Sequence, residues 1–229
     1  MREMPESPFP PLRRSRAARV AALCVAIGFA GSGFIPQFGG PGYESALAAG
    51  VILPAATALG LSFDVAGRRI SPLQAFGRAL SLGFWLAVLG LFIVLGHGFR
   101  VGICDAAWGI NLYLLGPMPG ALLGGVWGGA VGLAAGRVRA GWRRRTLCIA
   151  GALAGPLTGI GISLGRFYTS PMVFAFDPFF GYFAGPLYDT VIDGFWSLMT
   201  YRAGTLLTLL GLGCAAAHFD EALRFGWPR

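Results

Sequence analysis

The segment that decides the fold is residues 116–136, which read GPMPGALLGGVWGGAVGLAAG. It belongs to a longer uncharged run over residues 106–136. As one straight helix that run would be about 46 Å long, well beyond the roughly 30 Å hydrocarbon core of a bilayer. Pro117 and Pro119 should interrupt it, because proline removes a backbone donor and clashes with the preceding turn. We therefore expect a membrane crossing at about 119–136.

Glycine recurs at every fourth position of this segment, and again in the next apolar run. Residues four apart share one face of a helix, so each helix would present a groove without side chains. Small residues of this kind let helix backbones approach closely in membranes. We expect both helices to pack closely within the bundle, and they could do so against each other. The alternative is that the glycines line a pore or an oligomer seam. The helix-packing residues are Gly116, Gly120, Gly124, Gly128, Gly132, Gly136, Gly151, Gly155 and Gly159.

The composition of the whole chain indicates the same class of protein. Its 229 residues are 55% hydrophobic and only 12% charged, and the mean hydropathy is +0.65. A soluble domain carries about 25% charged residues. These values exclude a soluble enzyme, a disordered chain and a fibrous repeat. They predict an all-α fold, a polytopic helical membrane protein with about six transmembrane helices.

Six apolar stretches approach the roughly 20 residues that a crossing requires. A basic segment, 1–17, precedes them, and a short tail, 220–229, follows. We expect residues 71–79 to form a plain connecting loop, with an element that lies on the membrane surface or couples to a cytoplasmic partner as the alternative. The predicted spans cover about 18–35, 45–63, 79–99, 119–136, 146–165 and 203–219.

All 18 basic residues are arginines, and they fall between the apolar runs. With the N-terminus inside, fifteen arginines lie on the inner side and only Arg100, Arg166 and Arg202 on the outer side. Because positive charge resists translocation, this bias predicts cytoplasmic N- and C-termini in a bacterial inner membrane. The partner of these arginines is then the lipid bilayer, and we expect no nucleic acid. A cleaved secretory signal is the alternative for the first span, and its removal would leave the other spans oriented as before.

The segment 169–200 does not fit a span. It is dense in aromatic residues, and Pro171, Pro178 and Pro186 oppose a long regular helix. We expect an aromatic-rich extracytoplasmic loop that lies at the interface as a re-entrant or surface-parallel element. Residues 187–199 could form a short helix with two aspartates on one face.

Ionisable groups gather on the predicted outer side. Two arginines, at positions 166 and 202, lie at membrane depth, where a charge is costly unless it is paired or reaches the interface. Aspartates 177, 189 and 193 are the natural partners. The group is either a set of ion pairs that hold the loop, or a polar site for a ligand or a catalytic carboxylate. The candidate site comprises Arg100, Asp105, Arg166, Asp177, Asp189, Asp193 and Arg202.

Known catalytic patterns are missing from the sequence. The four cysteines are scattered without metal-binding spacing. The two histidines, His97 and His218, lie far apart, so no HExxH helix can form, and no phosphate-binding glycine loop is present. We therefore assign no catalytic residue, no metal and no cofactor.

Two blocks of sequence resemble a known group of proteins. One block is GHGFRVGICD at 96–105, and the other is RFYTSPMVFAFDPFFGYF at 166–183, followed by LYD at 187–189. Both resemble blocks in an uncharacterised family of bacterial polytopic inner-membrane proteins, some of which continue into a C-terminal peptidase-like domain. The resemblance covers about residues 90–205 and implies a stand-alone membrane part or a fragment of a longer chain.

Three functions remain open on the sequence alone. The first is a non-enzymatic scaffold, anchor or subunit of a membrane complex, which binds a membrane-protein partner, a second copy or lipid through loop 169–200. The second is a transporter or channel component, because helices broken by proline permit a cavity. The third is an intramembrane or interfacial enzyme that uses the outer carboxylates.

Overall fold

The computed structural model describes residues 15–103, 105–170, 174–184 and 195–219. Helices dominate it, with one short hairpin. Five helical segments among these residues are long and apolar enough to cross a membrane: α2, α3, the α4–α5 pair, α6 and α7. The elements are α1 (Arg16–Ser32), the 3-10 turn η2 (Pro36–Phe38), α2 (Tyr43–Ala66), α3 (Pro72–Val101), α4 (Ala106–Leu115), α5 (Pro117–Ala135), α6 (Trp142–Thr169), β1 (Phe174–Asp177), β2 (Gly181–Ala184) and α7 (Phe195–Ala217).

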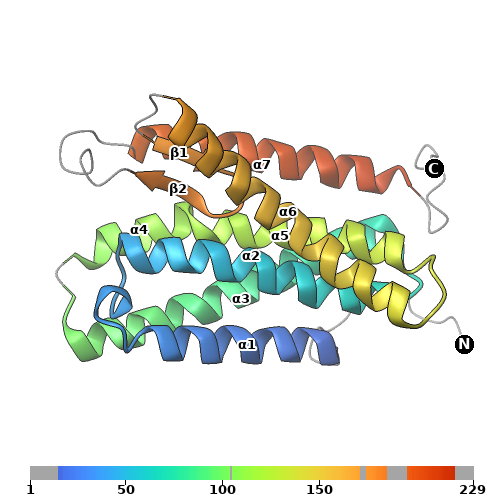
Figure 1. Ribbon diagram of the computed structural model, residues 1–229, viewed down its shortest axis with the longest axis horizontal. Coiled ribbons are helices and arrows are strands. Elements are labelled where there is room, and N and C mark those ends of the chain that lie inside the picture. The colour runs from blue at the N-terminus through green and yellow to red at the C-terminus, as the bar shows by residue number, and fades with distance from the viewer. Residues whose placement is uncertain (1–14, 104, 171–173, 185–194, 220–229) are drawn as a thin grey trace, which may run out of the picture.

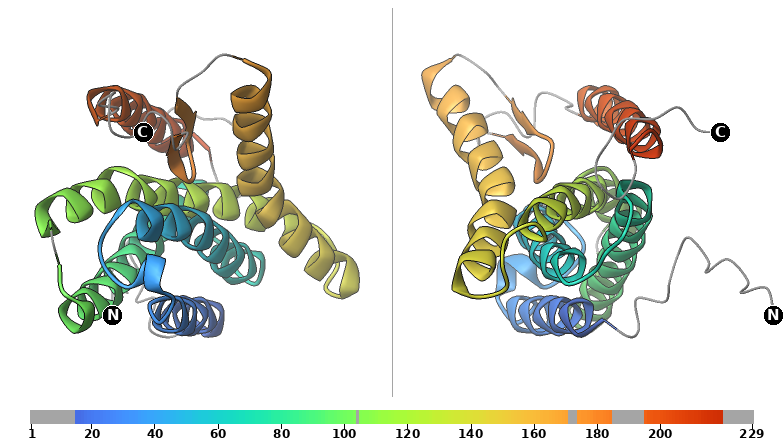
Figure 2. Two further views of the ribbon diagram at one scale, coloured as in Figure 1. Left: turned by 60° about the vertical axis from the view of Figure 1, so that its left-hand side comes forward. Right: turned by 90° about the vertical axis from the view of Figure 1, so that its right-hand side faces the viewer.

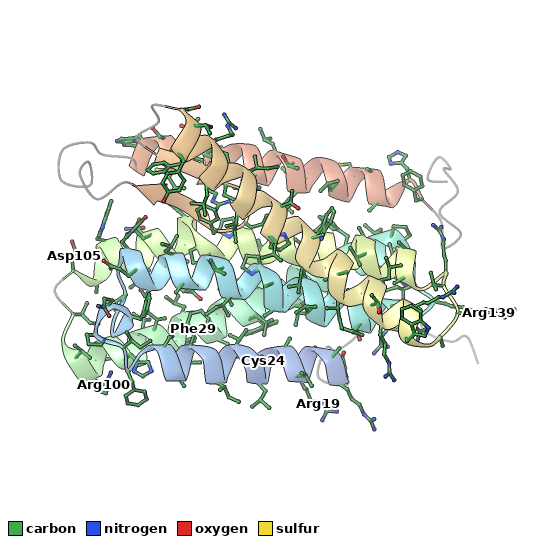
Figure 3. The ribbon with its side chains drawn as sticks, in the orientation of Figure 1. Arg19, Cys24, Phe29, Arg100, Asp105 and Arg139 are labelled. Carbon is green, nitrogen blue, oxygen red and sulfur yellow. The ribbon has the colours of Figure 1, made fainter. Side chains whose placement is uncertain are left out.

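The long helices run alternately in opposite directions along one axis (Figure 1). Most of the arginines therefore lie at one end of the bundle, which we call the arginine end. Arg19 and Arg139 mark this end in Figure 3, and Arg100 and Asp105 mark the opposite one. The two strands lie toward that opposite end, which we call the hairpin end.

The centre of the bundle is α5, packed between α2 and α3. Its glycines touch backbone directly: a Cβ on Gly124 would lie 2.7 Å from Cα of Pro54, and a Cβ on Gly128 would overlap the carbonyl of Ala58. On the other side, a Cβ on Gly125 would lie 2.7 Å from the carbonyl oxygen of Ala79. The glycines of α5 thus allow backbone contact with two helices at once.

The glycines of α6 have a different role. A Cβ on Gly151 would meet the Val131 side chain of α5, and one on Gly155 would meet the ring of Trp127. The Trp127 indole Nε1 also donates a hydrogen bond to the carbonyl of Gly151 at 2.8 Å. The predicted fourth and fifth spans therefore do touch, but the glycine stripe of α5 faces α2, and α6 receives large side chains from α5.

The uncharged run 106–136 breaks at Gly116, between α4 and α5. Helix α5 begins at Pro117, two residues before the predicted start of the crossing. Proline is tolerated in the first turn of a helix, where backbone N–H groups have no partner in any case. Pro117 and Pro119 therefore begin the new helix as well as ending the previous one.

The expectation of a plain loop at residues 71–79 was wrong, because α3 already begins at Pro72. The Ser71 hydroxyl accepts a hydrogen bond from the amide of Gln74 at 3.2 Å, and the Gln74 side chain accepts one from the amide of Ser71 at 3.0 Å. This is a capping box, and the Ser-Pro-Leu-Gln sequence was its signal.

A buried ion pair lies at the arginine end, and the sequence analysis did not anticipate it. Asp64 of α2 contacts the guanidinium of Arg78 on α3 at 2.6 Å, and both side chains are almost completely buried. Arg68, one turn after Asp64, contacts the other carboxylate oxygen at 3.1 Å. The pair fixes the end of α2 against the start of α3, since breaking a buried ion pair leaves an uncompensated charge.

Helix α1 packs along α2 and α3 through a stripe that includes Val25 and Phe29. Its end is held at the hairpin end of the bundle, where Arg100 donates a hydrogen bond to the carbonyl of Gly33 at 2.6 Å. The same guanidinium lies 4.8 Å from the ring centre of Phe34. A cation at this position also complements the negative end of the helix dipole.

Close contact between α5 and α2 leads to a prediction for Gly128→Ala. The added methyl group would overlap the backbone of Ala58, so we expect a loss of about 1–3 kcal/mol of stability, measured as thermal unfolding in detergent. Gly161→Ala is the matched control, because a Cβ there meets nothing within 4 Å. Equal melting temperatures for the two variants would contradict this packing.

Candidate functional site at the hairpin

Two short strands form the only sheet among the described residues. β1 and β2 pair antiparallel, with Phe174 opposite Ala184 and Asp177 opposite Gly181. Gly181 has a φ of 104°, a conformation that side-chain-bearing residues rarely adopt. Part of the predicted loop 169–200 is thus a β-hairpin, whose tip is the sequence Asp-Pro-Phe-Phe-Gly at 177–181.

Asp177 organises the tip of the hairpin. Its Oδ1 accepts hydrogen bonds from the amides of Phe179 at 2.7 Å and Phe180 at 3.0 Å. Its Oδ2 accepts one from the hydroxyl of Ser163, on α6, at 3.0 Å. The carboxylate is fully buried. An aspartate that bonds to amides two and three residues ahead stabilises a turn, and here it also ties that turn to α6.

Three glycines on three helices leave room for the tip. A Cβ on Gly50 of α2 would overlap the backbone of Phe180, and one on Gly120 of α5 would overlap the carbonyl of Phe179. On α6, a Cβ on Gly159 would lie 2.7 Å from Oδ2 of Asp177. The two phenylalanines are themselves buried. The hairpin tip is therefore inserted among the helices rather than resting on them.

Arg202 of α7 holds the tip from the other side. Its guanidinium donates to three backbone carbonyls, those of Leu115 at 2.6 Å, Gly116 at 2.7 Å and Pro178 at 2.7 Å. The Leu115 carbonyl lacks a helical donor because Pro119, four residues later, has no N–H. Arg202, only 2% exposed, supplies that donor and links the α4–α5 break to the hairpin.

Pairing between the predicted arginines and aspartates takes another form in the structure. Arg202 and Asp177 converge on the same hairpin, yet Arg202 binds backbone carbonyls, and Asp177 binds two backbone amides and the Ser163 hydroxyl. Within the ranges that the structure describes, no ion pair forms between them. Backbone at membrane depth needs donors and acceptors as much as charges need counterions, which explains the difference.

Helices α6 and α7 make few direct contacts, because the hairpin lies between them (Figure 2). Two grooves flank the hairpin there, and they share Pro178 and Tyr201. The first groove, of about 390 Å³, is lined by Gly159, Ile162, Ser163, Arg166, Phe176, Asp177, Pro178 and Tyr201. The second, of about 360 Å³, is lined by Leu123, Pro178, Thr200, Tyr201, Gly204, Thr205 and Thr208.

Tyr201 forms the ridge between the two grooves. Its ring stacks on Phe176, with the ring centres 5.5 Å apart, and it lies 5.7 Å from the guanidinium carbon of Arg202. Sequence reasoning missed both Tyr201 and Ser163. Neither has a local pattern to mark it, because each acquires its role only through a contact with the hairpin.

Two other predicted site residues, Arg100 and Asp105, lie apart from this group. Arg100 binds the end of α1. The carboxylate of Asp105 accepts a hydrogen bond from the amide of Trp108 at 2.9 Å and caps α4. Asp189 and Asp193 lie outside the described residues. No group of three or more His, Cys, Asp or Glu side chains that could hold a metal ion occurs in the described part of the chain.

No protein family model, curated protein or solved structure matches this chain.

The three carbonyl contacts of Arg202 lead to a prediction for Arg202→Lys. One compact ammonium cannot replace a planar guanidinium with donors at three corners, so we expect a loss on the order of 2–4 kcal/mol. Thermal unfolding in detergent measures it. Arg19→Lys, at an exposed position of α1, is the control and should behave like the unmodified chain. Equal stability of both variants would contradict the role given to Arg202.

Asp177 allows a second test by thermal unfolding in detergent, which separates the hydrogen bonds of its carboxylate from its negative charge. Asp177→Asn keeps the Oδ1 acceptor for both amides, and its amide nitrogen can donate to Ser163. Asp177→Ala leaves two buried amides unpaired, so it should cost about 1–3 kcal/mol more than the asparagine variant. Similar destabilisation in both variants would mean that the negative charge, and not the turn, is what the site requires.

Proposed function

We propose that this protein is a non-enzymatic, multi-pass protein of a bacterial inner membrane. It has six spans: α1 and the five longer helical segments. Both termini are cytoplasmic, and the aromatic-rich hairpin segment is extracytoplasmic. The arrangement of the arginines supports this orientation, because those of the predicted inner segments that lie in described residues gather at one end of the bundle.

The proposed task of the protein is to bind a membrane-protein partner or a lipid between α6 and α7. The single observation that carries this proposal is the pair of grooves beside the hairpin. The exposed walls of both grooves are mainly apolar, and polar side chains such as Arg166, Tyr201 and Thr205 interrupt them, as in most binding sites for hydrophobic ligands. The hairpin is fixed by buried contacts, so the site is formed before anything binds.

A transporter or channel component is the second candidate. The break at Gly116 and the inserted hairpin support it, because discontinuous helices with free carbonyls form ion sites in transporters. Here, however, the carbonyls of Leu115, Gly116 and Pro178 already bind the guanidinium of Arg202. A transported cation would have to displace a side chain that makes three hydrogen bonds.

An enzyme that uses the outer carboxylates has less support. A catalytic carboxylate must reach its substrate, whereas Asp177 is fully buried and accepts hydrogen bonds on both oxygens. Asp105 is engaged as a helix cap.

Photo-crosslinking from the groove tests the proposal. A benzoylphenylalanine probe at Ile162, which lines the first groove and is 58% exposed, should give a discrete adduct in native membranes. The control is the same probe at Ile27 of α1, which is 64% exposed and lies outside the grooves. We expect dispersed bulk-lipid adducts there. The same adduct pattern at both positions would contradict a binding role for the groove.

A further inference from the structure

Arg166 stands out among the groove residues because it is exposed and engaged with no carboxylate in the described ranges. It lies in the last turn of α6. The helix begins at Trp142, so Arg166 lies about 36 Å further along the axis, more than the thickness of the hydrocarbon core. Because α6 runs obliquely to the other helices (Figure 1), its depth is less than this length, and Arg166, at the hairpin end of the helix, lies toward the outer interface in the proposed orientation.

The groove beside Arg166 combines polar and apolar groups. Arg166 and Tyr201 line it together with Ser163 and the buried Asp177, and Ile162 and Phe176 supply apolar wall. The ring of Tyr201 is held in place by Phe176. An exposed cation and a phenol beside apolar side chains are the kinds of group that contact the phosphate and the acyl chain of a phospholipid.

On the basis of the proposed function, we infer that the groove between α6 and α7 binds one phospholipid, whose phosphate is held by Arg166 and whose acyl chain lies along the groove. Arginine recognises phosphate through paired, charge-assisted hydrogen bonds. The buried carboxylate of Asp177 keeps the phosphate at the mouth of the groove by repulsion. The volume of about 390 Å³ is within the range that accommodates a headgroup and the beginning of a chain.

Native mass spectrometry of the full chain tests this inference. The detergent-purified protein is mixed with dioleoylphosphatidylglycerol or with dioleoylglycerol, which has the same acyl chains and no phosphate. We expect retention of one phosphatidylglycerol molecule and weak retention of the neutral lipid. Arg166→Gln should weaken phosphatidylglycerol retention by at least about tenfold, since a charged hydrogen-bond donor is lost. Arg166→Lys, which keeps the positive charge, should retain phosphatidylglycerol better than Arg166→Gln does.

Arg19→Gln is the matched control, because this exposed arginine lies at the opposite end of the bundle. It should retain the lipid like the unmodified protein, and Arg166→Gln should have an unchanged melting temperature because its side chain is exposed. Equal retention of the two lipids, or unchanged retention in Arg166→Gln, would overturn the inference. So would displacement of the lipid by millimolar inorganic phosphate, which would indicate a site for the free anion.

The photo-crosslinking experiment with the probe at Ile162 distinguishes failure of this inference from failure of the proposed function. A discrete protein adduct there would support a binding groove and overturn the assignment of a phospholipid. The absence of any discrete adduct would remove the proposed function itself.

Discussion

The rest of the structure depends on one requirement, that backbone polar groups inside an apolar bundle find partners. The hairpin brings irregular backbone among the helices, and the α4–α5 break adds carbonyls that proline has deprived of donors. Arg202 supplies donors to Leu115, Gly116 and Pro178, and Asp177 accepts from the amides that the turn leaves unpaired. These two charged side chains are buried because they satisfy backbone, and the position of the hairpin between α6 and α7 follows from them.

Glycine makes this arrangement sterically possible. Glycines at 124 and 128 bring the backbones of α5 and α2 into direct contact. Single glycines on α2, α5 and α6 leave room for the hairpin tip, at Gly50, Gly120 and Gly159. One residue type therefore has two structural uses along a single helix: packing toward the middle of α5, and accommodation of the hairpin near its start. The grooves beside the hairpin result from both, since an inserted tip keeps α6 and α7 apart.

The sequence allowed the helical class, the break near Pro117 and the close packing of the glycine-rich helices to be predicted, because each depends on local chemistry. It did not identify α2 as the neighbour of the α5 stripe, since that choice depends on the order of helices in space. The partners of the charged residues were harder to predict. Asp177 and Arg202 were singled out from the sequence as ion-pair partners, but their partners in the structure are mainly backbone groups that no residue pattern marks. The Asp64–Arg78 pair was missed because its members lie at the edges of apolar runs, where charges are expected to face water. Asp189 and Asp193 lie outside the described residues, so their predicted place in the site stays a prediction.

Hydrogen–deuterium exchange of the unmodified chain measures most directly whether the hairpin tip is inserted in the bundle. The relevant amides are those of Phe179 and Phe180, which Asp177 holds in a buried turn. The account predicts that they exchange as slowly as the amides in the middle of α5, and far more slowly than the exposed connection around Gly141. Exchange at the rate of that connection would mean that the tip is open to water, and it would contradict the arrangement on which the grooves and the proposed binding site depend.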